Sequence, residues 1–274
     1  MEVLFSDAFA KKLEILATEK ALQYKNAKPF PHIYIDNFLP EEAAEVALAD
    51  FPEPKELEWI KFHESKQRKL AYNAIEKVPP GVREVMYFLN SRPILTFLEI
   101  LTGIDDLIPD PYYSGAGLHQ IQPGGNLEVH ADFNKHPRFK LDRRINMLVY
   151  LNKEWKEEYG GHFELWNTEM TAAEEKILPV FNRCTIFSTT TTSYHGHPTP
   201  LACPPGRTRK SMATYYYSVG RPEDESYGQH GSIFKHRPGT VPRLTLKEAV
   251  RAVTPPILLT MAKGLGGKKS APKK

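Results

Sequence analysis

Cysteine is scarce in this sequence, and the two cysteines present are far apart. Cys184 and Cys203 form no Cys-x-x-Cys pair, so the spacing typical of a structural zinc site is missing. Long apolar runs are missing too, and the first residues, MEVLFSDAFAKK, lack the layout of a secretory signal peptide. These absences predict a cytoplasmic protein without a membrane-spanning segment.

An excess of positive charge is missing outside the last twelve residues. The net charge is +3, but residues 263–274 carry five lysines and no acidic residue, so removing those five charges leaves −2 for the remainder. Because a nucleic-acid-binding domain presents a basic face, this distribution gives no indication of a nucleic-acid partner. We interpret 263–274 as a disordered solubilising tail, with weak attachment to an acidic surface as the alternative.

The composition and the residue patterns along the chain indicate four segments. The hydrophobic content of 41% and the charged content of 25% are ordinary for a globular protein. Segment 1–112 has helical spacing of apolar residues and is predicted to pack on a core formed by 113–220. Segment 221–262 is a Pro-, Gly- and Arg-rich extension with one predicted helix at 243–253, and 263–274 is the tail.

The pattern within the first segment is mainly helical. Helices are predicted over 5–26, from Leu39-Pro40 onward, over 80–90 and over 93–103. Proline and two glutamates in the first turn support the second of these helices. PHIYIDNF at 31–38 is predicted to form a short strand between the first two helices.

From about residue 113 the pattern changes to β-strands. Short runs rich in β-branched and aromatic residues are separated by turn residues such as Gly-Gly at 160–161. The runs are LHQIQP, NLEVHAD, RINMLVYLN, GGHFELWN, KILPVFN, RCTIFST and RKSMATYYYSVG. Many short strands without intervening helices indicate a mainly β core, a sandwich or a jelly roll, behind N-terminal helices.

A metal site is the strongest chemical hypothesis. His130 and Asp132 in VHADFN are two residues apart, so on a strand both side chains point to one face. Together with His195 they offer two imidazoles and one carboxylate, which can bind one face of an octahedral Fe(II) ion and leave three positions open. Alone, His-x-Asp is more often a surface pair. His197 is a rival for the distal ligand, although its place before a proline favours a pocket or loop role.

An anion site is predicted on the strand RKSMATYYY. Arg209 and Ser211 share one face, and a guanidinium followed by a hydroxyl can hold a carboxylate. Arg207 and Lys210 are alternatives for the same role. The strand RINMLVYLN supports a cavity, because Arg144, Asn146, Leu148 and Tyr150 would form an unusually polar face.

These motifs together resemble a known family. HAD at 130–132, RINMLVYLN at 144–152, GGHFELW at 160–166, SYHGH at 193–197 and RKS at 209–211 occur in order. In this arrangement the chain resembles the iron(II)- and 2-oxoglutarate-dependent oxygenases, in particular the branch of the prolyl 4-hydroxylases. The resemblance covers about 113–220 and implies a double-stranded β-helix, or jelly roll, carried on N-terminal helices.

The resemblance also implies roles for individual residues. His130, Asp132 and His195 would bind Fe(II) as metal ligands and catalytic residues. The residues implied around the cosubstrate 2-oxoglutarate are Arg209, Tyr150, Ser211, Asn146 and Gln122, with Gln120 as the alternative to Gln122. O₂ would be the oxidant and ascorbate a supporting reductant. The carboxylate of Asp132 favours hydroxylation over halogenation.

The substrate is predicted less directly. The basic loop at 133–144 follows the metal motif, so Asn134, Lys135, Arg138 and the more distant His197 are substrate candidates, and an anionic substrate is one hypothesis. A solvated basic loop is the competing interpretation. We expect hydroxylation of a small molecule such as an amino acid, a sugar or a biosynthetic intermediate. The alternatives are a protein prolyl hydroxylase, a non-catalytic jelly-roll binding module and, third, a cupin dioxygenase.

Overall fold

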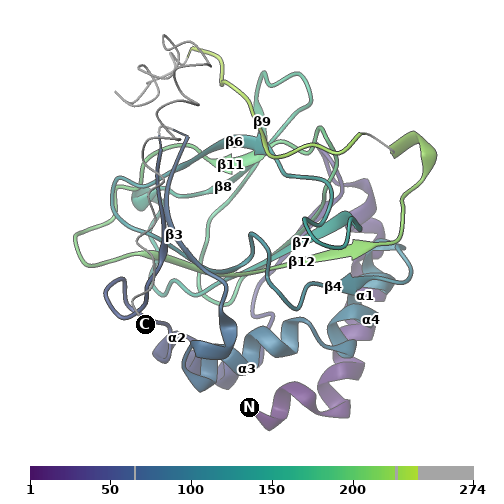
Figure 1. Ribbon diagram of the computed structural model, residues 1–274. Helices are drawn as coiled ribbons and strands as arrows, with labels where there is room; N and C mark the ends of the chain where they lie inside the picture. Colours follow the sequence, from purple (N-terminus) through teal and green to yellow (C-terminus); the bar gives the residue numbers. More distant parts are fainter. Residues whose placement is uncertain (65, 226–227, 240–274) are drawn as a thin grey trace, which may run out of the picture. The chain divides into compact units, whose positions relative to one another are not determined.

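The computed structural model describes residues 1–64, 66–225 and 228–239 (Figure 1). The predicted helix at 243–253 and the lysine-rich tail lie outside the described residues. The helices are α1 (Asp7–Asn26), α2 (Glu41–Ala49), α3 (Pro80–Leu89) and α4 (Arg92–Thr102). Short 3-10 helices cover η1 (Glu2–Phe5), η2 (Ile75–Lys77), η3 (Glu157–Tyr159) and η4 (Glu223–Glu225).

The four predicted helices are confirmed, and local chemistry explains their ends. The Ser6 hydroxyl accepts a hydrogen bond of 3.2 Å from the Phe9 amide and so caps the start of α1. At the end of α4, Gly103 takes a left-handed conformation with φ of 69°. No helix in the described ranges is long and apolar enough to cross a membrane.

The strands form one antiparallel sheet that curls into a nearly closed jelly roll. Their order is β1-β10-β7-β12-β5-β3-β6-β11-β8-β9, with β2 paired to β3, β4 to β12 and β13 to β6. The first seven strands are β1 (His32–Ile35), β2 (Ile60–Glu64), β3 (Gln67–Tyr72), β4 (Ile108–Pro109), β5 (Gly117–Ile121), β6 (Leu127–Ala131) and β7 (Asp142–Tyr150). The others are β8 (Phe163–Trp166), β9 (Ala173–Ile177), β10 (Cys184–Ser188), β11 (His195–His197), β12 (Arg209–Ser218) and β13 (Ile233–Phe234).

Two parts of the sheet differ from the sequence prediction. The strand predicted at 176–182 is wrong after Ile177, because β9 lies at 173–177 and Pro179 lacks the amide hydrogen that a ladder needs. The hairpin β2–β3 was not predicted, since its charged residues hide the alternation of apolar and polar positions. Segment 1–112 therefore contributes strands as well as helices, and β3 lies inside the sheet between β5 and β6.

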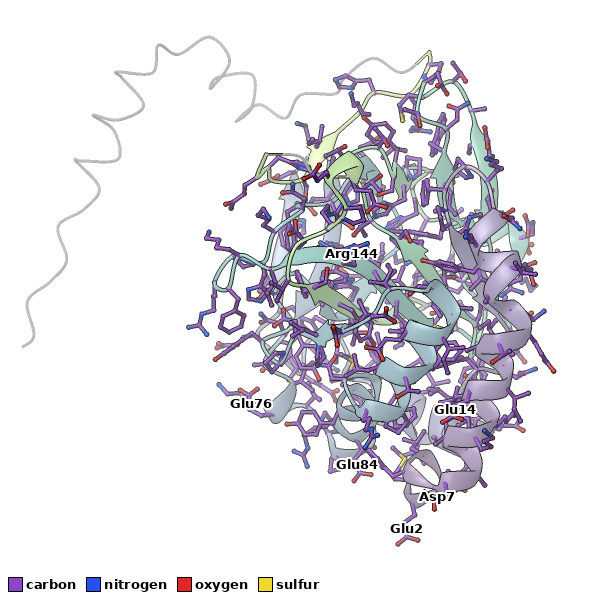
Figure 2. All side chains as sticks on the ribbon, turned by 90° about the vertical axis from the view of Figure 1, so that its right-hand side faces the viewer. Glu2, Asp7, Glu14, Glu76, Glu84 and Arg144 are labelled. Carbon is purple, nitrogen blue, oxygen red and sulfur yellow. The ribbon has the colours of Figure 1, made fainter. Side chains whose placement is uncertain are left out.

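The helices cover one face of the sheet and leave the other face for a site. Ile145, Met147 and Val149 of β7 belong to the same buried apolar cluster as residues of α1, α3 and α4. In Figure 1 the helices lie together on the side of β7 and β12 opposite β6, β8 and β11. Charged residues such as Asp7 and Glu14 lie on the outer surface of this helical layer (Figure 2). Because side chains alternate along β7, its other face points into the jelly roll.

Candidate active site

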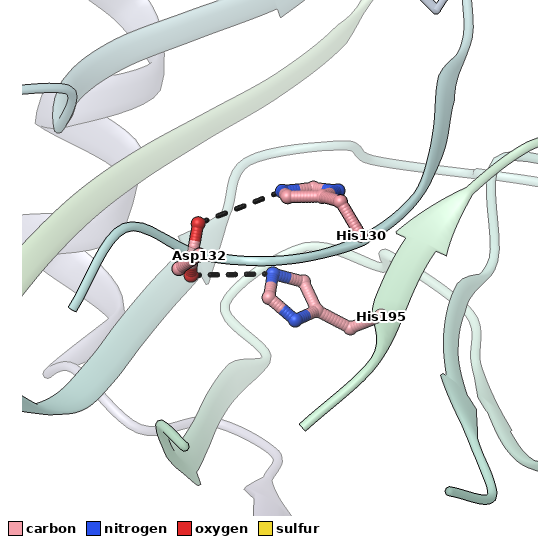
Figure 3. A group of neighbouring side chains, drawn as sticks. All are labelled: His130, Asp132 and His195. Carbon is pink, nitrogen blue, oxygen red and sulfur yellow. Dashed lines mark ion pairs between the residues drawn. The ribbon is translucent and has the colours of Figure 1, made fainter. Parts of the chain in front are cut away.

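Two neighbouring strands bring the three predicted metal ligands together (Figure 3). β6 and β11 are antiparallel, and His195 is paired directly with His130. Asp132 follows β6, with Oδ1 at 3.5 Å from His130 Nε2 and Oδ2 at 3.4 Å from His195 Nε2. The three ligand atoms lie within 4.8 Å of one another, and all three residues are buried. The chain thus contains a buried His-Asp-His facial triad.

Backbone contacts orient both imidazoles toward the same point. His130 Nδ1 lies 2.9 Å from the carbonyl oxygen of Glu128, and His195 Nδ1 lies 2.9 Å from that of Ser193. Since a carbonyl oxygen only accepts, each Nδ1 carries the proton and donates it. Each Nε2 is thereby turned toward Asp132, and the neutral tautomer with its proton on Nδ1 is the one that a metal ligand needs.

The Asp132 carboxylate is held in place by two donors. Arg143 Nη2 donates to Oδ2 over 2.9 Å, and Asn146 Nδ2 donates to the same oxygen over 2.7 Å. Burial by itself would raise the pKa of the Asp132 carboxyl. The Arg143 guanidinium, together with the adjacent His195 and His130, outweighs burial and holds that pKa well below its usual range. The carboxylate is therefore ionised and aimed before any metal binds.

A β-bulge places Arg143, and not Arg144, beside the Asp132 carboxylate. The ladder between β12 and β7 shifts after Tyr216, where Tyr216 pairs with Ile145 and Tyr217 pairs with Arg143. Arg144, which is labelled in Figure 2 and was predicted to share the polar inner face, is skipped and bonds instead to Ser218 and Glu225. Arg143 is completely buried, with its guanidinium carbon 3.4 Å from the ring centroid of Tyr215.

The triad lies in a cavity of about 300 Å³ inside the jelly roll. Its charged or titratable lining residues are Lys69, His119, His130, Asp132, Arg143, His195, His197, Arg209, Tyr72 and Tyr215. Three cations and one carboxylate thus line the cavity, before any ligand is counted. Positive charge is in excess at a site where burial makes uncompensated charge costly.

Arg209 is the cation best placed for the predicted anion. It is buried, it lines the cavity, and its Nε donates to the Gly161 carbonyl oxygen over 2.9 Å. Its guanidinium carbon lies 4.9 Å from the ring centroid of Tyr150. Among the described residues no carboxylate forms an ion pair with Arg209. A buried guanidinium without an acidic partner fits a carboxylate ligand, as does Ser211 on the same wall.

Arg207 and Lys210, the alternatives to Arg209, make contacts outside the cavity. Arg207 is bonded to the carbonyl oxygen of Lys153, and Lys210 lies 3.7 Å from Glu53. Neither of the two lines the cavity. Strand alternation explains this for Lys210, since Arg209 and Ser211 share the inner face of β12, whereas Arg207 precedes the strand.

The expected glutamine is replaced by a histidine at this site. Gln122 is exposed and outside the cavity, and Gln120 donates to Thr208 over 2.9 Å on the other face of β5. His119 lines the cavity instead, and its Nε2 is buried without a hydrogen-bond partner. Burial, with Lys69 and Arg209 nearby, keeps the pKa of His119 well below its usual range.

His197 lies in the cavity lining and is not part of the metal-ligand group. Both of its ring nitrogens are buried and have no hydrogen-bond partner in the described part of the chain, and burial holds its pKa well below the usual value. It is a neutral polar group available to a ligand. His162 lies outside the cavity and bonds to Glu157 over 2.8 Å.

The other substrate candidates are not in the cavity lining. Asn134 donates to the Gly228 carbonyl oxygen and accepts from the His230 amide, so its amide holds the C-terminal extension. Lys135 bonds to Asp142 over 2.9 Å and lines a neighbouring hollow. Arg138 is exposed and stacks on Tyr112. The structure therefore does not bring these three together with the triad.

Lys69, His119 and Arg143 are the residues that sequence reasoning missed. Lys69 is on β3, which was not predicted as a strand, and Arg143 precedes the stretch that carried the resemblance. The alternation in GLHQI could have identified His119, because His119 and Ile121 share a face.

Residues 116–217 match the family model described as the 2OG-Fe(II) oxygenase superfamily. This match covers the triad, Arg209 and the strands that carry them. With the buried His-x-Asp…His triad inside it, the matched region is a 2OG-Fe(II) oxygenase domain. Among curated proteins none matches the sequence.

Solved structures agree with this fold. A Pseudomonas putida prolyl 4-hydroxylase has 15% identity and a TM-score of 0.55, over 74% of this chain and 100% of that one. A prolyl 4-hydroxylase from Phytophthora capsici has 20% identity and a TM-score of 0.53, over 88% and 72%. HygX from Streptomyces hygroscopicus, with nickel, 2-oxoglutarate and hygromycin B bound, has 12% identity and a TM-score of 0.51, over 78% and 96%. At these identities the likeness establishes the jelly-roll fold carried on helices.

Proposed function

We propose that this oxygenase hydroxylates a small molecule and converts 2-oxoglutarate to succinate and CO₂. His130, Asp132 and His195 would hold the iron, whose chemistry when bound is to reduce O₂ as 2-oxoglutarate is decarboxylated and a substrate C–H bond is oxidised. The single observation that carries the proposal is the triad inside a cavity that also contains Arg209, which has no acidic partner among the described residues.

Different residues around this cavity would have different roles. The two imidazoles present Nε2, and Arg143 and Asn146 keep the Asp132 carboxylate ionised and aimed. Arg209 and Ser211 would bind the distal carboxylate of 2-oxoglutarate, with Tyr150 beside the guanidinium. Apolar lining residues such as Phe163 and Phe187 would limit the access of water to the reacting groups.

The size of the cavity favours a small substrate. About 300 Å³ is at the lower end of the range for small-molecule sites, and the cosubstrate would take part of it. HygX, which shares the fold, is described with the small molecule hygromycin B bound. An amino acid, a sugar or a biosynthetic intermediate is compatible with this volume.

The test is an anaerobic titration of the metal-free protein with Fe(II) and 2-oxoglutarate, followed by its visible charge-transfer band. We expect a band in the wild type, none in Asp132→Ala, and a requirement for much more 2-oxoglutarate in Arg209→Met. Succinate release with candidate substrates then identifies turnover. Absence of both the band and calorimetric 2-oxoglutarate binding would contradict the proposal and favour a non-catalytic binding module.

One observation supports a peptidyl-proline substrate as the second candidate. A hollow lined by Lys135, Pro137 and residues 229–231 shares Gly115 and Phe133 with the metal cavity. A longer substrate could extend from the cavity into this hollow. Succinate release stimulated by proline-rich peptides, and not by free amino acids or sugars, would favour this candidate.

A further inference from the structure

Lys69 places a third cation in the cavity, on a strand that no part of the proposed mechanism uses. Along β3, the alternate residues Gln67, Lys69 and Ala71 all line the cavity, so the strand directs Lys69 inward. β3 lies beside β6, the strand that carries His130. The Lys69 ammonium lies 5.4 Å from the ring centroid of Phe62. Among the described residues no carboxylate forms an ion pair with Lys69.

A count of the charges in the cavity shows that bound iron and 2-oxoglutarate together would supply no counter-ion for Lys69. Lys69, Arg143 and Arg209 carry three positive charges against the single carboxylate of Asp132. Fe(II) adds two positive charges and 2-oxoglutarate adds two negative charges, so the filled site keeps the same excess of two. Arg143 and Arg209 are buried and Lys69 is partly buried. Because charge removed from water is unfavourable without a partner, the complete site favours a further anion.

The surroundings of Lys69 give this anion a place to bind. Phe62 and Ile60 of β2 and Phe234 of β13 line the same part of the cavity as apolar groups. Phe234 also stacks on His130, with ring centroids 5.2 Å apart. A molecule with an apolar body and one anionic end would contact these rings while its charge meets Lys69. Burial lowers the pKa of Lys69 to about 8, so the ammonium form still predominates at neutral pH.

We propose that Lys69 is a specificity-determining residue that binds an anionic oxygen group, a carboxylate or a phosphate, on the substrate. This inference rests on the proposed function, because it assumes that Arg209 and the metal engage 2-oxoglutarate. It differs from the hypothesis of a basic substrate loop, since Lys135 and Arg138 do not line the cavity.

The test uses full-length protein loaded with Mn(II), which replaces iron, and saturated with 2-oxoglutarate. Benzoate, its neutral counterpart benzamide and inorganic phosphate are the three probes. Paramagnetic relaxation of benzoate and benzamide protons and of the phosphate phosphorus reports binding near the metal, with Zn(II)-loaded protein as the diamagnetic reference. The variants are Lys69→Met, Lys69→Arg and Lys61→Met, the last being a matched control for an exposed lysine on β2.

We expect benzoate or phosphate, and not benzamide, to bind near the metal in the wild type. Benzoate binding indicates a carboxylic acid substrate, and phosphate binding indicates a phosphate ester. Lys69→Met should weaken the bound anion at least about 10-fold, Lys69→Arg should restore it, and Lys61→Met should equal the wild type. Calorimetric affinity for 2-oxoglutarate should be the same in all four proteins.

Three results would overturn the inference while 2-oxoglutarate binding persists. They are equal binding of benzamide and benzoate, unchanged anion binding in Lys69→Met, and no binding of either anion. A loss of 2-oxoglutarate affinity in Lys69→Met would also overturn it, because Lys69 would then serve the cosubstrate. Failure of the wild type to bind 2-oxoglutarate at all is a different result, which contradicts the proposed function itself.

Discussion

Arg143 Nη2 lies 2.9 Å from Asp132 Oδ2, and the guanidinium is completely buried. Aromatic rings flank it, with its central carbon 3.4 Å from the centroid of Tyr215 and 4.4 Å from that of Phe133. This arginine is therefore fixed by packing as well as by charge. It positions the metal-binding carboxylate without being a metal ligand.

Loss of this contact should weaken metal binding. Changing Arg143→Met removes the charge that lowers the Asp132 pKa, and contacts of this type affect metal affinity about 10- to 100-fold. The measurement is a competition titration with Mn(II) or Co(II). Arg144→Met is the matched control, because Arg144 is skipped by the bulge and does not line the cavity.

Removal of a buried charge partner can also prevent folding, at a cost of about 3–5 kcal/mol. Asn146→Ala is the milder variant, since it removes no charge: it deletes one donor to the same oxygen and the amide oxygen that accepts from Arg143 Nε. We expect Asn146→Ala to lower metal affinity by a smaller factor with an unchanged circular dichroism spectrum. Wild-type affinity in both variants would show that Asp132 needs no such support.

Arg209 should control affinity for 2-oxoglutarate and leave metal binding intact. Replacing it with methionine removes charge-assisted hydrogen bonds worth about 1.5–3 kcal/mol, which corresponds to roughly 10- to 150-fold weaker binding. Calorimetry on Mn(II)-loaded protein measures this change. Arg207→Met should bind 2-oxoglutarate as the wild type does, because Arg207 contacts the Lys153 carbonyl oxygen outside the cavity. The opposite ranking of the two variants would assign the role to Arg207.

Gly161 should affect the same affinity through the position of Arg209. A methyl group at Gly161 would lie 2.5 Å from Leu201 Cδ2 and 3.1 Å from Arg209 Cδ. Gly160 also has a positive φ, but a methyl group there meets nothing within 4 Å. Both alanine variants should lose stability from backbone strain, whereas only Gly161→Ala should raise the KM for 2-oxoglutarate several-fold. Equal KM values for the two variants would contradict this account.

The buried histidines should make the metal-free protein less stable in mild acid. Burial lowers the pKa of His195 to about 4 and holds those of His119 and His197 well below 6.5. Below pH 6.5 the unfolded chain therefore binds more protons than the folded chain, and stability falls as the pH decreases toward 4. Each such histidine contributes about 1.4 kcal/mol per pH unit within that window.

Urea unfolding of the metal-free protein between pH 7 and 5 measures this slope. His197→Phe removes one titrating group and keeps an aromatic ring, so its slope should be shallower by about that amount. His162→Phe serves as the control, since His162 lies outside the cavity beside Glu157. A slope in His197→Phe equal to that of the wild type would show that His197 binds as many protons in the folded chain as in the unfolded chain.

Short-range patterns in the sequence were sufficient to predict the helices, most of the strands and the metal triad. Two-residue spacing alone places His130 and Asp132 on one face, and turn residues separate the strands near it. The same alternation favoured Arg209 over its neighbours. It was less useful for β2 and β3, where charged residues on an exposed hairpin carry no apolar period.

By itself, the sequence determined which residue types are available and at what spacing: two histidines, one aspartate and one arginine on strands. Only the tertiary structure decided which cations share their cavity. Arg143, and not Arg144, lines the cavity because a β-bulge shifts the ladder between β7 and β12. Lys69 lines it because β3, which is distant in the sequence, pairs with both β5 and β6. Strand pairing over such distances depends on the packing of the whole sheet, and no local pattern encodes it.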